Sequence, residues 1–432
     1  MIDRLLVSVA PDQTRIALMD GARLAELHVD MPHDGLAPGD ILLGTVEAAF
    51  NDEWFVRIGK GEPGLVGARH ALARQPDGSL KRAHIEGPGQ VLLVQVARTD
   101  PVKGPRLNVQ VRLTGRYLEL EPLQRGVVGL DDAPDELRPW LRHHRGPPGL
   151  AVRPAVARAS IDDLEHDRAE LVTRWDQLAA AARDARPPAR LLRGPTALAA
   201  ALRDHPLVEV ICDDGATVAA LRRAGASVTP HRAPEPLFAD IDPQIEQALG
   251  SRVDLPGGGW ISIEPTTALT AIDVNSGDDD PVHCNQAAAE AIAHQLRLRD
   301  IGGLVVIDFI RGTAVQRRRL MQALRRALAD DPADVRVEDP TKLGLVELSR
   351  ARQRAPLASH FREPCPVCAG DGAVETVAAA VADIRRQAAR ARPGATVQAA
   401  PAVAAALRLA APDLAVAEAP QLGPRGWRLD AD

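Results

Sequence analysis

Two stretches decide the fold of this chain: ALTAIDVNS at positions 268–276 and GGLVVIDFI at positions 302–310. Each stretch is short, rich in branched apolar residues and bounded by turn residues, which is typical of a buried β-strand. Each also carries an aspartate, Asp273 or Asp308, where an ordinary strand would carry another Val or Ile. A carboxylate inside such a strand is costly unless it is paired or holds a metal ion. The two aspartates therefore predict a site for a hard cation.

The order of elements around these strands indicates how the aspartates meet. A helix is expected between the strands, from about Gln286 to Arg299, because apolar residues recur there at helical spacing. Strand, helix and strand in this order imply a parallel crossover. If the two strands are neighbours, Asp273 and Asp308 project from one end of the sheet about 5 Å apart. Two carboxylates this close repel each other, and a magnesium ion between them relieves the repulsion.

Asn275 adds a hydrogen-bonding group to this pair. It lies two residues after Asp273 and therefore points to the same face of the strand. Its amide can hold a carboxylate or a substrate phosphate. The chemistry that the set favours is attack by a metal-activated water on a phosphodiester. The alternative is that Asp273 and Asp308 merely end their strands and cap the turns that follow, and spacing alone leaves both interpretations open.

The composition limits the classes of protein to consider. The 432 residues allow two to four domains, and an apolar content of 45% is ample for their cores. A net charge of −6 argues against a wholly basic nucleic-acid coat protein, and 3% aromatic residues leave only a thin surface for stacking bases. No signal peptide or membrane span is evident. The 4 cysteines are too few for a disulfide framework, so we expect a reducing cytoplasm.

The pattern outside the two strands predicts further elements. Roughly the first 34 residues alternate apolar and polar positions, with a turn at Asp20-Gly21, and predict a β-hairpin. Short strands with glycine turns, from about 39 to 117, are typical of a small barrel of the OB type. Helices are expected at 161–182 and at about 315–329, the second rich in arginine. The Ala- and Pro-rich tail is expected to fold as a small domain.

Cys365 and Cys368 are separated by two residues, the usual spacing of one half of a tetrathiolate zinc site. The chain has no second such pair, because Cys212 and Cys284 stand alone in other contexts. A closed zinc site therefore needs distant partners or a second subunit. A redox pair, or a simple turn with buried thiols, is the alternative.

Several motifs together resemble the ribonuclease E/G family. They are TALTAIDVNS (267–276), IAHQLRLRDIGG (292–303), VIDFI (306–310), LGLVELSR (343–350) and the Cys-Pro-x-Cys-x-Gly run at 365–370, in the family's order. Weaker similarity extends over nearly the whole chain. The resemblance implies a magnesium-dependent endoribonuclease that cuts single-stranded RNA and leaves a 5′-phosphate. It places the magnesium ligands, for one ion per site, on Asp273 and Asp308, and a supporting asparagine on Asn275.

The same resemblance implies a mixed α/β, multidomain architecture. The expected parts are an RNase H-like domain (1–35 with 190–252), an inserted S1-like barrel (36–117), a degenerate 5′-sensor-like segment (118–189), a metal-dependent catalytic domain (253–361), a zinc link (362–373) and a small C-terminal domain (374–432). In this family two protomers each give a Cys-x-x-Cys to one shared zinc ion. Cys365 and Cys368 thus imply a homodimer, or a homotetramer built from dimers.

The resemblance also assigns residues that hold RNA. Phe55, in FVRIG (55–59), corresponds to an RNA-facing phenylalanine, and Lys103 corresponds to a lysine that contacts RNA. Leu65 stands where relatives carry a second RNA-facing phenylalanine. Barrels of this type bind single strands with a basic groove and stacked aromatic side chains. The alternatives are that Phe55 belongs to the core and that Lys103 is an ordinary surface lysine.

Relatives sense the 5′-monophosphate of RNA with an Arg-Thr pair, and the corresponding residues here are Arg153 and Pro154. Arg153 can still fork onto a phosphate. Pro154 has neither a hydroxyl nor a backbone N–H. We therefore expect a weak or absent preference for RNA with a 5′-monophosphate.

Two groups of arginines could track phosphates electrostatically. One lies on the expected helix between Arg317 and Arg326, and the other comprises Arg350, Arg352 and Arg354. A charged helix face is usually only solvated, so the role of the first group stays open. The match to the family favours RNA contact for Arg350 and Arg354.

The chain departs from the family beside the metal pair. The loop after Ser276 is shorter and reads GDDDP (277–281), Ala287 replaces a usual glutamate, and Arg311-Gly312 replaces an Asp-Met pair. Added acids repel an RNA backbone unless metal or arginine offsets them. The competing hypotheses are therefore a catalytically weak RNA-binding or assembly protein that retains the fold, and a magnesium enzyme for another phosphodiester such as DNA. The retained Asp–Asn–Asp set favours an active endoribonuclease.

Overall fold

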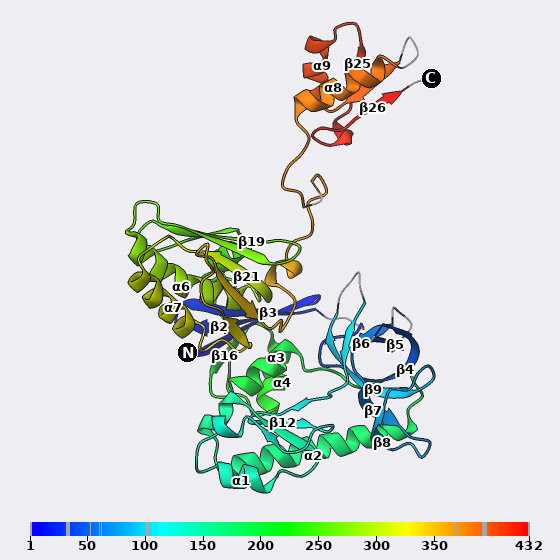
Figure 1. The fold of residues 1–432 in the computed structure, drawn as a ribbon, viewed down its shortest axis with the longest axis vertical. Coiled ribbons are helices and arrows are strands. Elements are labelled where there is room, and N and C mark those ends of the chain that lie inside the picture. Colours follow the sequence, from blue (N-terminus) through cyan, green and yellow to red (C-terminus); the bar gives the residue numbers. More distant parts are fainter. Residues whose placement is uncertain are drawn as a thin grey trace. The chain divides into compact units, whose positions relative to one another are not determined.

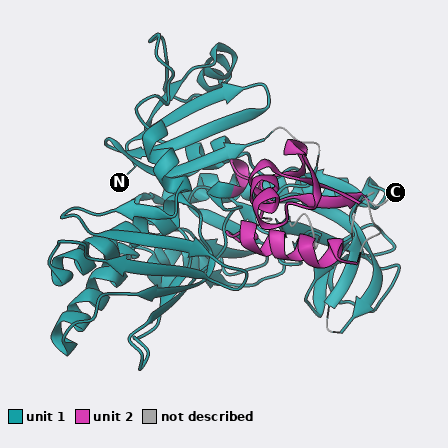
Figure 2. Cartoon of the chain, turned by 90° about the horizontal axis from the view of Figure 1, so that it is seen from above, with its two compact units in different colours: residues 1–358 teal, residues 359–432 magenta. Residues whose placement is uncertain are grey.

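The computed structural model describes residues 2–430, apart from 32–34, 52, 60, 62, 100–103, 369 and 391–394. The chain forms two compact units, residues 1–358 and residues 359–432 (Figure 2). Both are mixed α/β structures, and the larger one contains four β-sheets within its described residues. None of the helices in the described part of the chain is both long and apolar enough to cross a membrane.

A five-stranded sheet of order β17-β16-β1-β2-β3 opens the larger unit. Antiparallel pairing of β2 with β3 confirms the predicted hairpin, and Gly21 supplies the positive φ of 61° that its turn requires. β16 then pairs with β1 in parallel from a distant part of the chain. The elements are β1 (Arg4–Ala10), β2 (Gln13–Asp20), β3 (Arg23–Asp30), α3 (Ala197–Asp204), β16 (Glu209–Cys212), α4 (Gly215–Arg223) and β17 (Val228–Pro230).

A small closed barrel follows the first three strands, as the short strands with glycine turns predicted. Strands β4, β5, β6, β10 and β9 pair in that order, and β9 closes the ring by pairing with β4 (Figure 1). Three further strands, β7, β8 and β15, extend the same sheet. The bounds are β4 (Ile41–Phe50), β5 (Glu53–Arg57), β6 (Gly64–Val66), β7 (His70–Arg74), β8 (Leu80–His84), β9 (Val91–Arg98), β10 (Arg106–Asn108) and β15 (Ala189–Leu192).

The next segment combines a small sheet with one long helix. Helix α2 (Ile161–Asp184) confirms the helix predicted at 161–182, and Ser160 begins it with a capping box to Asp163. The helix packs on a four-stranded sheet of order β11-β12-β14-β13. The other elements are β11 (Leu113–Thr114), β12 (Leu118–Glu121), β13 (Val127–Val128), α1 (Arg138–His143) and β14 (Gly149–Val152).

The two aspartate strands lie in the middle of a six-stranded sheet of order β18-β19-β20-β21-β23-β22. β20 (Thr270–Asn275) and β21 (Gly303–Asp308) pair in parallel, and α6 (Pro281–Leu298) connects them, as the predicted crossover requires. The remaining elements here are α5 (Asp242–Leu249), β18 (Arg252–Asp254), β19 (Trp260–Pro265), α7 (Ala314–Ala327), β22 (Val335–Val337) and β23 (Val346–Arg350).

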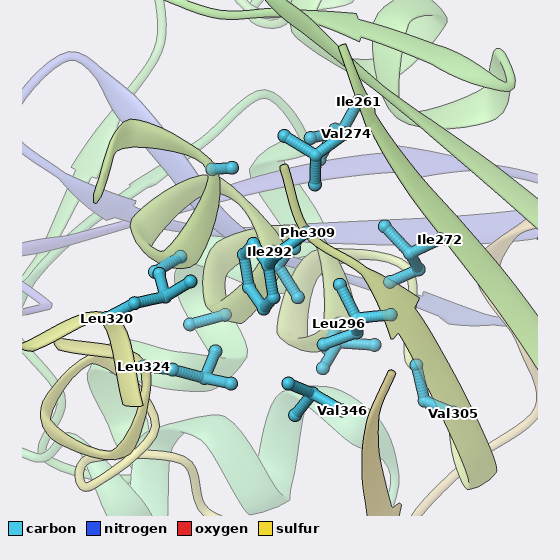
Figure 3. Close-up of a cluster of buried hydrophobic side chains, with 14 of the residues drawn as sticks. Ile261, Ile272, Val274, Ile292, Leu296, Val305, Phe309, Leu320, Leu324 and Val346 are labelled. Carbon is cyan, nitrogen blue, oxygen red and sulfur yellow. The ribbon is translucent and has the colours of Figure 1, made fainter. Parts of the chain in front are cut away.

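Only one face of this sheet is buried. Apolar residues at alternate positions of the strands, such as Ile272 and Val305, pack against Ile292 and Leu296 of α6 and against α7 (Figure 3). The residues between them, Asp273 included, point to the open face. The expectation that the aspartates sit inside buried strands is therefore wrong. They project into solvent, so no metal is needed to offset burial of their charge.

Helix α6 begins at Pro281, five residues before the predicted start at about Gln286. Asp280 caps it, because its Oδ1 accepts hydrogen bonds from the backbone N–H groups of Val282 and His283 at 3.0 and 3.1 Å. Pro281 at the first helical position fits, since that residue needs no N–H donor. The apolar periodicity starts only at the second turn, which hid the true beginning.

The side of α6 away from its own sheet packs against β3 (Figure 1). His294 Nε2 lies 2.7 Å from the carbonyl oxygen of Leu24, and the Arg297 guanidinium lies 2.6 Å from the buried carboxylate of Glu26. Burial raises the pKa of Glu26, but the hydrogen bond from His28 and the surrounding positive charges hold it well below its usual range. Polar contacts thus join α6 to the first sheet.

This contact predicts that the fold loses stability in mild acid. Burial lowers the pKa of His294 from 6.5 to about 4, so the unfolded chain binds a proton there that the folded chain does not. The stabilisation is complete above pH 6.5 and is lost as the pH falls towards 4. From pH 7 to pH 5 we expect a loss of about 2 kcal/mol in the free energy of unfolding. Urea titrations of His294→Gln should show a shallower pH dependence, and exposed His166→Gln should match the wild type.

The smaller unit has its own core. Helices α8 (Val377–Ala388) and α9 (Pro401–Ala410) pack on a three-stranded sheet of order β25-β24-β26. Ile384, Val397 and Leu407 are fully buried between them. The strands are β24 (Thr396–Ala399), β25 (Ala415–Glu418) and β26 (Trp427–Asp430). The alanine-rich helices suit this small core, because alanine allows close packing at little entropic cost.

Candidate active site

Asp273 and Asp308 lie opposite each other on neighbouring strands. The parallel register of β20 with β21 pairs Asp273 directly with Asp308. Paired residues of parallel strands project from the same face, and adjacent strands are about 4.8 Å apart. Both aspartates are exposed, near the carboxyl ends of their strands. The structure thus brings together the two carboxylates that the sequence singled out.

Asn275 orients one member of this pair. Its side-chain Nδ2 donates a hydrogen bond to Asp273 Oδ2 at 2.8 Å. The bond holds the Asp273 carboxylate in one orientation and leaves its other oxygen, Oδ1, without a protein partner among the described residues. Asn275 is therefore a positioning residue for Asp273, which is one of the two roles the sequence predicted for it.

Two of the three aspartates in the acidic loop at 277–281 have local hydrogen-bond partners. The Asp279 carboxylate accepts the Asp280 backbone N–H at 2.8 Å and lies 2.8 Å from His283 Nδ1. Asp280 itself caps α6. Of the three acids, only Asp278 is exposed without such a partner among the described residues. Hydrogen bonds thus fix the orientation of two of the three carboxylates, and the loop keeps all three negative charges.

The donor set at this sheet end fits magnesium. Among the described residues, no group of three or more His, Cys, Asp or Glu side chains could hold a metal ion. A site here rests on the two carboxylates of Asp273 and Asp308. Magnesium typically uses one or two carboxylates, keeps several waters and binds substrate phosphate. Two hard oxygen donors on an open sheet face meet that requirement.

Comparison with known proteins places the chain among nucleases. The ribonuclease E/G family matches residues 113–353, which include both aspartate strands. The chain belongs to the ribonuclease E/G family. It is 30% identical to the ribonuclease G of Salmonella typhimurium and to that of Escherichia coli, over 94% of this chain and 93% of each relative. It is 34% identical to the ribonuclease E of Synechocystis over 77% of this chain and 55% of that protein.

The barrel of this ribonuclease E/G family member presents Phe55 away from its core. Trp54 and Val56 face inward, and Trp54 Nε1 donates to the Ala68 carbonyl at 3.1 Å. Phe55, between them, is half-buried and is not part of the barrel core. The alternation of the strand thus favours the RNA-facing interpretation of Phe55 over the core interpretation. Lys103 lies outside the described residues.

Arg153 is engaged inside the protein. Its guanidinium donates to the Gly115 carbonyl oxygen at 2.7 Å and to Asp204 Oδ1 at 2.9 Å. It thereby ties the end of β14 to the loop before β12 and to the last turn of α3. Pro154 begins a short 3-10 helix directly after it. The arginine expected to contact a 5′-phosphate therefore has protein partners already.

These contacts strengthen the expected loss of 5′-end sensing. We expect this protein to cut 5′-monophosphate and 5′-hydroxyl forms of one RNA at rates within about twofold, because forked phosphate binding needs a free guanidinium. Initial rates on the two forms of a labelled oligonucleotide measure this. A tenfold preference for the monophosphate would contradict it.

Arg350 does not face RNA. Only 1% of its side chain is exposed, and its guanidinium pairs with Asp331 at 2.9 Å and with Asp300 at 3.3 Å. The assignment of Arg350 to RNA contact rested on the match to the family, and the buried, paired guanidinium does not support it. Arg354 is 39% exposed, but it too pairs with Asp300 at 2.6 Å and with Glu26 at 3.0 Å. Its guanidinium connects the loop that follows β23 to Glu26 in β3.

The burial of Arg350 predicts a stability defect. Arg350→Ala leaves the buried Asp331 without its cation and Asp300 with Arg354 alone, which we expect to cost about 3–5 kcal/mol of unfolding free energy. Arg336→Ala removes an exposed pair with Asp334 from the neighbouring strand and should cost no more than about 1 kcal/mol. Chemical denaturation of both variants tests this. Equal, small losses would mean that Arg350 is not a structural cation.

The Cys-x-x-Cys segment holds two free thiols close together in the sequence. Cys365 is exposed and Cys368 is half-buried, and neither is in a disulfide. Backbone N–H groups of Cys368 and Val367 donate to the Cys365 sulfur and lower the pKa of its thiol. Cys212 and Cys284 are buried elsewhere in cores and are not available as ligands. Two prepared thiols suit half of a tetrahedral zinc site.

Sequence reasoning missed Asn285 of α6, which binds the chain just after β21. Its side chain donates to the Ile310 carbonyl at 2.8 Å and accepts the Ile310 N–H at 3.1 Å. The bonds fix the chain two residues after Asp308. The signal was present as a buried polar residue on the apolar face of a helix, where an asparagine must find partners. The helix was predicted to begin at about Gln286, one residue after Asn285, so Asn285 was left out of it.

Proposed function

We propose that this member of the ribonuclease E/G family hydrolyses phosphodiester bonds within single-stranded RNA, with one magnesium ion held by Asp273 and Asp308. The observation that carries the proposal is the direct pairing of these two exposed aspartates on parallel strands. Family membership and the names of its relatives support an endoribonuclease. RNA processing or decay in the cytoplasm is the setting that follows.

The residues of the site have separate tasks. When bound, magnesium would supply Lewis acidity: it favours the ionised form of water and offsets negative charge on the phosphate. Asp273 and Asp308 fix where that cation sits, and Asn275 holds the Asp273 carboxylate in place. The open sheet face leaves room for a strand of RNA, because no helix covers it among the described residues.

The barrel and the cysteine segment supply the remaining functions. Phe55 offers a stacking surface for a base, and Lys103 is retained as a proposed phosphate contact. Cys365 and Cys368 give one half of a zinc site, so a second copy of the chain would complete it. We therefore propose a homodimer with one shared zinc ion. A homotetramer built from two such dimers would need a second interface on other surfaces.

Cleavage of a labelled oligonucleotide tests the proposal. A 5′-labelled single-stranded RNA of about 15 nucleotides should be cut internally with magnesium and stay intact with EDTA. The same sequence as DNA should stay intact in both cases. Cutting of DNA at the RNA rate would favour the broader phosphodiesterase hypothesis. Tight RNA binding without any cleavage would favour the alternative, a catalytically weak RNA-binding or assembly protein.

A further inference from the structure

A cleft of about 360 Å³ lies directly beside the pair formed by Asp273 and Asp308. Asp308 forms part of its wall, together with the first turns of α6 and α7 and the loop at 340–344. Phe309 and Leu320, which belong to the core of this domain (Figure 3), line the cleft on its apolar side. The cleft is therefore continuous with the candidate active site but is built from different side chains.

The charges of this cleft suit a phosphate. Arg311, Arg317, Arg319 and Lys342 line it, and none of them has an ion-pair partner among the described residues. Asp308 is the only acid in its described lining. The positive ends of α6 and α7 border it as well, and helix N-termini attract anions. By contrast, Arg325 on the same α7 lies outside this cleft and pairs with Asp339 at 2.8 Å.

The apolar side of the cleft suits a nucleobase. Leu343 is 79% exposed at the rim, where its side chain can lie against the flat face of a ligand. The side-chain amide of Gln286, on the same wall, is exposed and has no hydrogen-bond partner among the described residues. Bases of single-stranded RNA are held by apolar contact on their faces and by hydrogen bonds at their edges.

We propose that this cleft binds the nucleotide adjacent to the scissile phosphate and so contributes to the choice of cleavage site. Arg317 and Arg319 hold its phosphate, Leu343 covers the face of its base, and Gln286 contacts the base edge. This inference rests on the proposed function, since it takes RNA as the substrate and Asp308 as the neighbouring metal ligand.

Two pairs of substitutions on one helix test the phosphate contacts. Arg317→Ser with Arg319→Ser should weaken binding of a fluorescent single-stranded RNA by about tenfold or more, measured without magnesium. Arg318→Ser with Arg326→Ser removes the same charge outside the cleft and should change affinity no more than about twofold. Equal losses in both double variants would show a general charge effect and overturn the proposal.

Cleavage-site profiles test the base contact. On a pool of random RNA with magnesium, Leu343→Ser should alter base preference at one fixed position next to the cut, while Leu207→Ser, 90% exposed elsewhere, should not. An unchanged profile for Leu343→Ser rejects base binding in the cleft. The affinity measurement needs no cleavage. If the wild-type protein were inactive, the proposed function would be refuted, and the affinities of the two double variants would still test the cleft. Normal cleavage with unaltered affinity and profile would refute the cleft alone.

Discussion

Asp273→Asn is expected to lower the rate of RNA cleavage by about a thousandfold or more, which corresponds to about 4 kcal/mol of transition-state stabilisation. The substitution keeps the shape of the side chain but removes the negative charge that would hold the cation opposite Asp308. Since Asp273 is exposed, the folded state should tolerate the change. Affinity for RNA measured without magnesium should therefore stay at the wild-type level or rise slightly.

Glu264→Gln provides the matched control. Glu264 is an exposed carboxylate on the neighbouring strand β19, and its register partner is Ala271, so it lies on the same sheet but not in the pair. The Glu264→Gln variant should cleave RNA at the wild-type rate. The assay is the initial rate of cutting of a labelled single-stranded RNA over a range of magnesium concentrations. Wild-type rates for Asp273→Asn would sink the two-carboxylate mechanism.

Cys365→Ser is expected to abolish zinc binding and to shift the protein from dimer to monomer. A tetrahedral thiolate site gains much of its affinity from each sulfur, so a hydroxyl in place of one thiolate leaves a zinc ion poorly held. Because both protomers carry the change, the dimer would lose two of its four thiolate ligands at once. We expect the dimer dissociation constant to rise about a hundredfold or more.

Val367→Ser is the control for this second prediction. Val367 is an exposed side chain between the two cysteines, so its change tests the local loop without removing a ligand. It should retain half a zinc ion per chain and the dimer. Metal analysis and light scattering of the purified proteins report both quantities. A wild-type dimer that contains no zinc, or a Cys365→Ser dimer as stable as the wild type, would remove the basis for a shared metal.

The two strands that carry the aspartates, β20 and β21, could be predicted from the sequence because their signal is local. The alternation of Ile272, Asp273 and Val274 requires only that a strand forms, and the intervening helix then fixes a parallel pair. The closed barrel and α2 were predictable for the same reason, since short strands and a clear helical period do not depend on distant contacts. Asn275 was placed correctly because its partner is only two residues away.

Long-range partners explain what the sequence could not predict. Arg350 carries the same charge as a surface arginine, and only the fold shows that Asp331 and Asp300 bury it. Arg153 likewise finds Asp204 in another segment. The contacts of Asp279 with His283 and of Asp280 with the start of α6 were also missed, because they depend on where that helix begins.

The pairing of Asp273 with Asp308 constrains how this chain can change over evolutionary time. Side chains alternate along a strand, so inserting or deleting one residue within β20 or β21 would turn a carboxylate into the apolar layer beneath. The connection between the strands carries no such restriction, so its length is free to vary. Homologues should therefore keep strand spacing fixed while their loops drift, so that the interval from each aspartate to its flanking apolar residues outlasts overall similarity.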